Sequence, residues 1–144
     1  QVVGVFDKKL LKIFADALKN LNIKYAWIVN SEDGLDEISP YTKTNVAQLK
    51  NGKISEIIID PKKLNIGANK IDDLLGDDAQ FNANKMLDIF KGKDNDFSKA
   101  VCLNAAAGLM VAEKHLVYSD AYDEARQHIL SGKTYESLKG IQNV

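Results

Sequence analysis

The sequence predicts an α/β fold with three layers, in which a mixed β-sheet that includes an antiparallel hairpin is flanked by helices. Between Gln1 and Val29, two apolar runs rich in β-branched and aromatic residues enclose an amphipathic helical pattern, which is typical of a βαβ unit with parallel strands. Further along, Asn51-Gly52 separates two strand-like runs, and this dipeptide is a strong signal for a tight hairpin. We expect a single domain over residues 1–144, a length sufficient for one core.

The individual elements follow from the apolar pattern. Strands are expected over residues 1–6, 25–29, 44–49 and 53–59. Helices are expected over residues 10–21, 81–90, 96–117 and 119–132 and from 134 onward, with a helical turn over 71–75. Asp7 and Ser119 are the expected caps of two of these helices. The 96–117 segment is apolar on nearly all sides, so this helix should be central and buried.

Composition and charge exclude several classes of protein. With 45% hydrophobic and 27% charged residues, the chain resembles an ordinary globular domain and not a disordered or collagen-like one. The net charge is -1, and Arg126 is the only arginine, so the basic stripe of a nucleic-acid-binding surface is lacking. No apolar run approaches the length of a membrane span. We expect no signal peptide, because charges at residues 7–9 interrupt the first apolar stretch.

An acidic segment directly after the second expected strand is the main candidate site. Glu32, Asp33, Asp36 and Glu37 place four carboxylates at the carboxyl end of that strand, where open α/β sheets bind ligands. Mg²⁺ prefers carboxylate oxygens together with substrate phosphates, and Gly34 permits a sharp turn between the two acidic pairs. The segment is therefore either a magnesium site or a solvated acidic loop. The spacing does not match a calcium-binding EF-hand.

Other polar residues have competing interpretations. Asn104, inside the apolar helix, could reach a ligand or satisfy a neighbouring backbone group. His115 and His128 have no partner at metal-ligand spacing, which argues against a zinc site. Cys102 is most simply a small core residue; as the single cysteine it excludes an internal disulfide and fits a reducing, cytoplasmic location. Neither of the common glycine-rich phosphate-binding motifs is present.

Several motifs, in this order, resemble the carboxy-terminal part of the anthranilate phosphoribosyltransferase family. The central ones are Asp33-Gly34-Leu35-Asp36-Glu37 and Leu103-Asn104-Ala105-Ala106-Ala107. Between them lie Leu75-Gly76-Asp77-Asp78-Ala79 and Asn82-Ala83, and the two ends of the chain, at residues 1–5 and 129–133, also look like this family. The resemblance covers nearly the whole chain, and its two central motifs are specific in combination.

The resemblance implies a function for an intact protein. Family members transfer a phosphoribosyl group from phosphoribosyl pyrophosphate to anthranilate in tryptophan biosynthesis. The family's magnesium-binding Asp and Glu match Asp36 and Glu37, which makes Mg²⁺ the expected cofactor. The family's phosphate loop and anthranilate-contacting arginine are not found here, so substrate-binding residues are expected upstream of Gln1. The chain would then be a carboxy-terminal fragment of the catalytic α/β domain, inactive alone, from a protein that forms homodimers when intact.

Two departures from the family pattern leave alternatives open. Asn30-Ser31 stands where the family usually has His-Gly, and Gly76-Asp77-Asp78 stands where it usually has Gly-Gly-Asp. A non-catalytic, nucleic-acid-binding relative of the same fold is one alternative, against which the balanced charge counts. A nucleoside phosphorylase relative is another, although Asp36-Glu37 favours pyrophosphate chemistry. If elements on the amino side are lacking, we also expect a bare apolar sheet edge or helix face that self-associates.

Overall fold

A computed structural model describes residues 1–67 and 74–142 of the chain. The strands are β1 (Val2–Gly4), β2 (Tyr25–Ser31), β3 (Thr44–Lys50) and β4 (Lys53–Ile59). The helices are α1 (Leu10–Asn20), α2 (Ala79–Phe90), α3 (Asp96–Val111), α4 (Tyr118–Leu130) and α5 (Lys133–Gln142), and a short 3-10 helix, η1, spans Pro61–Leu64. None of the helices in these ranges is both long and apolar enough to cross a bilayer.

The four strands form one mixed sheet in the order β1-β2-β3-β4. β1 runs parallel to β2, with Val3 opposite Ile28, whereas β3 and β4 are antiparallel to their neighbours. The expected hairpin is present, since Asn51 and Gly52 both have positive φ and join Lys50 to its partner Lys53. The predicted α/β fold with a mixed sheet and an antiparallel hairpin is confirmed.

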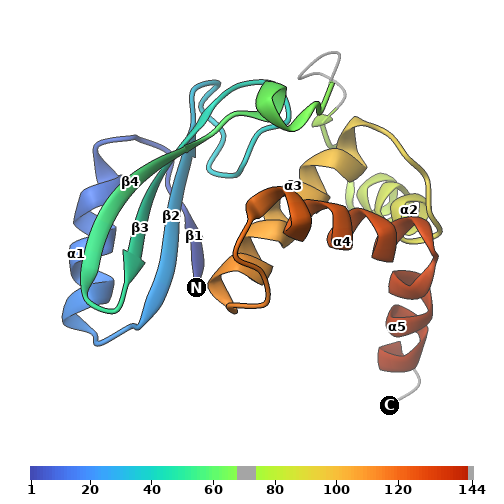
Figure 1. Cartoon of the computed structure of the whole chain (residues 1–144). Helices are drawn as coiled ribbons and strands as arrows, with labels where there is room; N and C mark the ends of the chain where they lie inside the picture. The colour runs from blue at the N-terminus through green and yellow to red at the C-terminus, as the bar shows by residue number, and fades with distance from the viewer. Residues whose placement is uncertain (68–73, 143–144) are drawn as a thin grey trace.

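Helices cover both faces of the sheet, which produces the three expected layers (Figure 1). Alternate residues of β2 divide between two cores, because successive side chains of a strand point to opposite faces. Ala26 and Ile28 pack with Leu11 and Ala15 of α1 on one face. Trp27 and Val29 belong to the larger core on the other face, which includes α3, α4 and the end of α2. Figure 1 shows α2–α5 gathered together on that side of the sheet.

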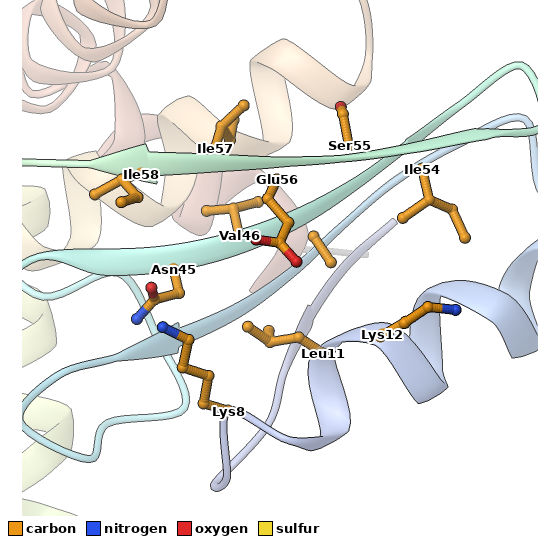
Figure 2. Close-up of a pocket in the computed structure, with 11 residues that line it drawn as sticks. Lys8, Leu11, Lys12, Asn45, Val46, Ile54, Ser55, Glu56, Ile57 and Ile58 are labelled. Carbon is orange, nitrogen blue, oxygen red and sulfur yellow. The ribbon is translucent and has the colours of Figure 1, made fainter.

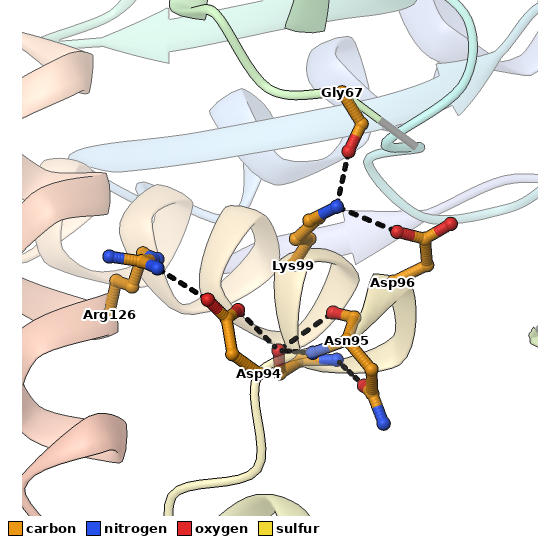
Figure 3. A network of polar contacts seen from close by, with 7 residues as sticks. Gly67, Asp94, Asn95, Asp96, Lys99 and Arg126 are labelled. Carbon is orange, nitrogen blue, oxygen red and sulfur yellow. Dashed lines mark hydrogen bonds and ion pairs between the residues drawn. The ribbon is translucent and has the colours of Figure 1, made fainter. Parts of the chain in front are cut away.

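The start of α3 is anchored by the polar network drawn in Figure 3. Asn95 caps the helix by accepting a hydrogen bond from Ser98 N, and the Ser98 hydroxyl reciprocally accepts from Asn95 N, both at 2.9 Å. Asp94 forms an ion pair with Arg126 of α4, and Lys99 contacts both Asp96 and the carbonyl oxygen of Gly67. These contacts connect the first turn of α3 to α4 and to the segment after η1.

The carboxyl-terminal helices differ from the sequence prediction in their boundaries. The helix expected over 96–117 ends at Val111, because Glu113 takes a left-handed φ of 55°. Glu113 N donates to Met110 O and Lys114 N to Leu109 O, which is a Schellman ending without the usual glycine. This helix is buried on one side only, since Ala105 and Gly108 are exposed. The expected burial on nearly all sides was therefore wrong.

Other helices and strands also begin or end at residues that differ from the sequence prediction. Ser119 does not cap α4. The helix begins at Tyr118, and its N-cap residue, Val117, makes no side-chain capping hydrogen bond. Asp7 does not cap α1 as expected, because the cap position is Lys9; Asp7 instead accepts a hydrogen bond from Lys9 N at 2.8 Å in the turn before the helix. β1 has three residues instead of the six expected. Most of the helical turn expected between Ile71 and Leu75 lies outside the described residues.

β1 forms the edge of the sheet and passes very close to the acidic segment after β2. A Cβ atom on Gly4 would lie only 1.7 Å from Asp36 O and 2.7 Å from Asp36 C. Both are backbone atoms and cannot rotate away. Glycine is therefore required in this strand because another backbone approaches it, a role typical of strand glycines. The absence of a side chain at Gly4 determines where the Asp36 backbone can lie.

We predict that Gly4→Ala in the full-length protein displaces the Asp36 backbone and lowers the free energy of unfolding by about 1–3 kcal/mol. The matched control is Gly108→Ala in α3, where a new Cβ meets nothing within 4 Å. That change should be neutral or should stabilise by up to about 1 kcal/mol through helix propensity. Chemical denaturation measures both variants, and equal stabilities of the two would contradict the close approach at Gly4.

Candidate active site

The acidic loop that follows β2 is closed on itself by backbone hydrogen bonds. Ser31 N donates to Leu35 O and Gly34 N to Ser31 O, at 2.9 and 3.0 Å. Glu32 N reaches Lys43 O at 2.9 Å, next to the start of β3. Gly34 has a φ of 90°, a left-handed conformation that favours glycine. The loop is therefore a tight turn at the carboxyl end of β2, the end at which the sequence predicted a site.

The four carboxylates of the loop do not gather at one point. Asp33 Oδ2 accepts a hydrogen bond from Ser39 Oγ at 2.5 Å, and Asp33 Oδ1 accepts from Leu35 N at 3.3 Å. These bonds give Asp33 a structural role within the loop. Glu32 is exposed and borders a different hollow from the later pair. Two of the four carboxylates thus remain as candidate ligands.

Asp36 and Glu37 border the same hollow, which has a volume of about 330 Å³. Val2 and Gly4 of β1, Val29 of β2 and Asn104 of α3 complete its lining. Both carboxylates belong to exposed residues, and neither has a hydrogen bond or ion pair to a side chain or backbone group of the described residues. Unpaired carboxylates at the rim of a hollow are free to bind a cation.

This pair fits Mg²⁺ better than a tightly enclosed metal. Within residues 1–67 and 74–142, no three metal-ligating side chains gather to form a site by themselves. Mg²⁺ usually keeps several waters and binds through one or two carboxylates together with phosphate oxygens. Asp36 and Glu37 could supply such carboxylates, whereas the phosphate oxygens would come from a substrate. The donor set therefore suits a magnesium ion that bridges protein and substrate.

Buried hydroxyl groups hold the backbone beneath this pair. Ser31 Oγ donates to Glu37 O at 2.5 Å and contacts Thr44 Oγ1 at 2.6 Å. Because Ser31 has one hydroxyl proton, Thr44 is the donor in the second contact. Ser39 N then donates to both hydroxyl oxygens, at 3.1 and 3.2 Å. These bonds attach the acidic segment to β2 and β3.

Asn104 holds the same segment from the opposite side. Its Oδ1 accepts from Ile38 N at 2.9 Å, and its Nδ2 donates to Ile38 O at 3.1 Å and to Ala100 O at 3.0 Å. Of the two roles that the sequence allowed for Asn104, the structure shows the one in which the side chain satisfies backbone groups. Asn104 also borders the hollow with Asp36 and Glu37. The sequence did not predict that Asn104 would lie in this site.

Sequence reasoning missed both Gly4 and the hydroxyl network. A glycine within an apolar strand is a signal for close backbone approach, but it does not identify the approaching segment. Ser31, Ser39 and Thr44 carry no sequence signal, because their hydrogen bonds become defined only when β3 pairs with β2.

The remaining candidates do not form sites. His115 Nε2 contacts Glu124 Oε2 in a partly exposed pair, and His128 borders a separate apolar hollow among the helices. Cys102 is buried, and burial raises the pKa of its thiol to about 11. A thiol with such a pKa is a poor nucleophile at neutral pH. Its interpretation as a core residue is supported by its place in the larger core.

Another hollow lies on the α1 side of the sheet, between α1 and the β3–β4 hairpin (Figure 2). Leu11 and Ile54 contribute apolar surface, and Lys8, in the turn before α1, and Glu56, on β4, reach over it. This groove is on the face opposite Asp36 and Glu37. Its lining contains two lysines, Lys8 and Lys12, and a single carboxylate, Glu56, which makes it a weaker candidate for metal chemistry.

The raised pKa of Cys102 predicts slow alkylation in the folded full-length protein. At pH 8, a thiol with a pKa of about 11 is ionised in roughly one molecule in a thousand, whereas an ordinary thiol near 8.5 is about one quarter ionised. We expect iodoacetamide to modify Cys102 slowly in buffer and rapidly in denaturant. Mass spectrometry of the peptide that contains Cys102 measures both rates, and equal rates would contradict its burial.

Comparison with known proteins adds to this geometry. Residues 1–135 match the glycosyl transferase family, a/b domain. Over all 144 residues the chain is 81% identical to an anthranilate phosphoribosyltransferase from Pelagibacter ubique, of which it covers 44%. It is 38% identical to the enzyme of the same name from Alkaliphilus metalliredigens, covering 98% of this chain and 42% of that protein. The chain thus spans less than half the length of these relatives.

Solved structures support the fold. The anthranilate phosphoribosyltransferase (TrpD) from Thermus thermophilus matches with a TM-score of 0.85 and 26% identity, over 94% of this chain and 40% of that one. The enzyme from Saccharomyces cerevisiae in complex with PRPP and Mg matches with a TM-score of 0.86 and 22% identity, over 96% and 40% of the two chains. Because the family match extends over nearly the whole sequence, the chain belongs to the glycosyl transferase family and forms part of its a/b domain.

Proposed function

We propose that this chain is the carboxy-terminal part of an anthranilate phosphoribosyltransferase. The intact protein would transfer the phosphoribosyl group of phosphoribosyl pyrophosphate to the amine of anthranilate, with pyrophosphate as the leaving group. The observation that carries the proposal is that Asp36 and Glu37, unpaired and exposed, border one hollow beside β1. The 81% identity to the Pelagibacter protein over all 144 residues supports it independently.

In this proposal, Asp36 and Glu37 hold the Mg²⁺ ion that binds the pyrophosphate of the donor. A bound Mg²⁺ would neutralise the negative charge that grows on the leaving pyrophosphate. The two side chains orient the donor relative to the sheet edge, and the rigid backbone beneath them reduces the entropy cost of this orientation. No protein nucleophile is needed, because positioning and electrostatic stabilisation are sufficient for the transfer. This agrees with the buried, poorly ionised thiol of Cys102.

Several parts of the proposal concern the intact protein. The residues that contact anthranilate and the remaining phosphates lie outside this chain, and homodimer formation and a cytoplasmic location are predictions. A nucleic-acid-binding role finds little support in a chain with a net charge of -1 and one arginine. No specific observation favours the alternative of a nucleoside phosphorylase relative.

The isolated 144-residue chain is expected to have no transferase activity, because the proposal assigns most contacts to the donor and the contacts to anthranilate to the rest of the protein. Consumption of anthranilate, which is fluorescent, can be followed in the presence of phosphoribosyl pyrophosphate and Mg²⁺. The full-length protein is the positive control. Turnover by the isolated chain would refute the assignment of the substrate contacts to the rest of the protein.

Removing either carboxylate in the full-length protein should weaken its response to magnesium. We expect Asp36→Asn and Glu37→Gln to raise the Mg²⁺ concentration for half-maximal turnover by on the order of ten- to a hundredfold, as loss of metal-site groups commonly does. Both changes preserve shape and remove charge. Glu32→Gln, in the same loop but on a different hollow, is the matched control and should leave the Mg²⁺ response unchanged. Equal responses from all three variants would remove the assignment of the metal to this pair.

A further inference from the structure

We infer that Asn104 is a positioning residue that fixes the backbone of the Asp36–Glu37 pair, an inference that rests on the proposed function of this pair. The Asn104 amide is bonded to both the N–H and the C=O group of Ile38, at 2.9 and 3.1 Å. An asparagine side chain that pairs with both backbone groups of one residue replaces the hydrogen bonds that a neighbouring strand would supply. Here the residue so held is 66 positions away along the chain.

The hydrogen bonds of Asn104 indicate positioning and not the binding of an anion. Its two amide protons go to Ile38 O and Ala100 O, and its oxygen accepts from Ile38 N. No donor remains for a phosphate or carboxylate group. The bond to Ala100 O, one turn earlier in α3, also fixes the rotamer of Asn104 itself. The amide is therefore held by its own helix and directed at the acidic segment.

The position of Ile38 makes this contact effective. Ile38 N belongs to the peptide group that joins it to Glu37, so the hydrogen bond from this N–H restrains the backbone of Glu37 directly. The Ile38 side chain is 1% exposed in the larger core, which prevents the segment from sliding. Ser31 Oγ binds the carbonyl of Glu37 from the other side at 2.5 Å. Glu37 and Ile38 are thus restrained on both sides, while the two carboxylates remain free.

A neutral amide is well suited to this position. Asn104 borders the same hollow as Asp36 and Glu37, so a basic residue there would compete with a cation for the carboxylates. An acidic residue would add a third negative charge. The amide restrains the backbone without changing the charge of the site. Partners that orient metal ligands in this way commonly affect metal affinity or activity by about ten- to a hundredfold.

The test uses the full-length protein and the variant Asn104→Ala. Hydrogen–deuterium exchange should show faster exchange of the Ile38 amide, which loses its acceptor. The Mg²⁺ concentration for half-maximal turnover should rise about tenfold or more. Val101→Ala, a half-buried change in the same helix, is the control for a general loss of stability. It should lower the free energy of unfolding and leave both readouts unchanged.

Asn104→Asp is a second variant in case Asn104→Ala does not fold. It keeps an oxygen that can accept from Ile38 N and loses both donors, so it should protect the Ile38 amide better than alanine does. Because it also adds a negative charge to the hollow, only its hydrogen exchange is compared. Unchanged exchange at Ile38 in Asn104→Ala would overturn the restraint. Faster exchange with an unchanged Mg²⁺ response would overturn its link to the acidic pair. A wild-type protein without transferase activity would instead overturn the proposed function, and the exchange measurement would still decide the restraint.

Discussion

The structure of the candidate site depends on the hydrogen bonding of a single short segment, Asp36–Ser39. Its backbone groups are bound by Ser31 Oγ, by the Asn104 amide and by the shared hydroxyls of Ser31 and Thr44. The close approach of β1 at Gly4 limits the same segment from a further side. Buried backbone groups need such partners, and here they come from β2, β3 and α3. The acidic segment is therefore fixed by elements that are far apart in the sequence.

This arrangement separates two tasks within one acidic loop. Asp33 is bonded to Ser39 Oγ and Leu35 N, so its charge stabilises the turn. Asp36 and Glu37 keep their carboxylates outside the network while their backbone is inside it. A cation that binds them meets ligands whose backbone is already ordered, which reduces the entropy cost of binding. Rigidity beneath free ligands suits the magnesium site proposed above.

α3 connects the acidic segment with the helices that follow it. Its first turn is capped by Asn95 and tied to α4 through Asp94 and Arg126 (Figure 3). Further along the same helix, Asn104 reaches the acidic segment. A similar device occurs before α2, where Asn82 bonds to both backbone groups of Asp77, at 3.0 and 2.9 Å. Asparagine amides thus hold polar turns at two of the motifs that carry the family resemblance.

Local physical chemistry made much of the fold predictable. A continuous apolar run identified β2, and apolar residues at helical spacing identified α1. Asn51-Gly52 identified the hairpin because both positions tolerate positive φ. Helix ends were less predictable. Glu113 occupies a left-handed position that glycine usually signals, so the end of α3 had no local marker.

The sequence by itself determined the α/β class, the position of the acidic loop after a buried strand, and the residue types that suit Mg²⁺. Only the tertiary structure decided which carboxylates remain free, because Asp33 is engaged by Ser39 and Asp36 is not. It also decided the role of Asn104, since Ile38 and Asn104 meet only when α3 packs against the sheet. Hydrogen bonds across such distances depend on packing, and no pattern of neighbouring residues encodes them.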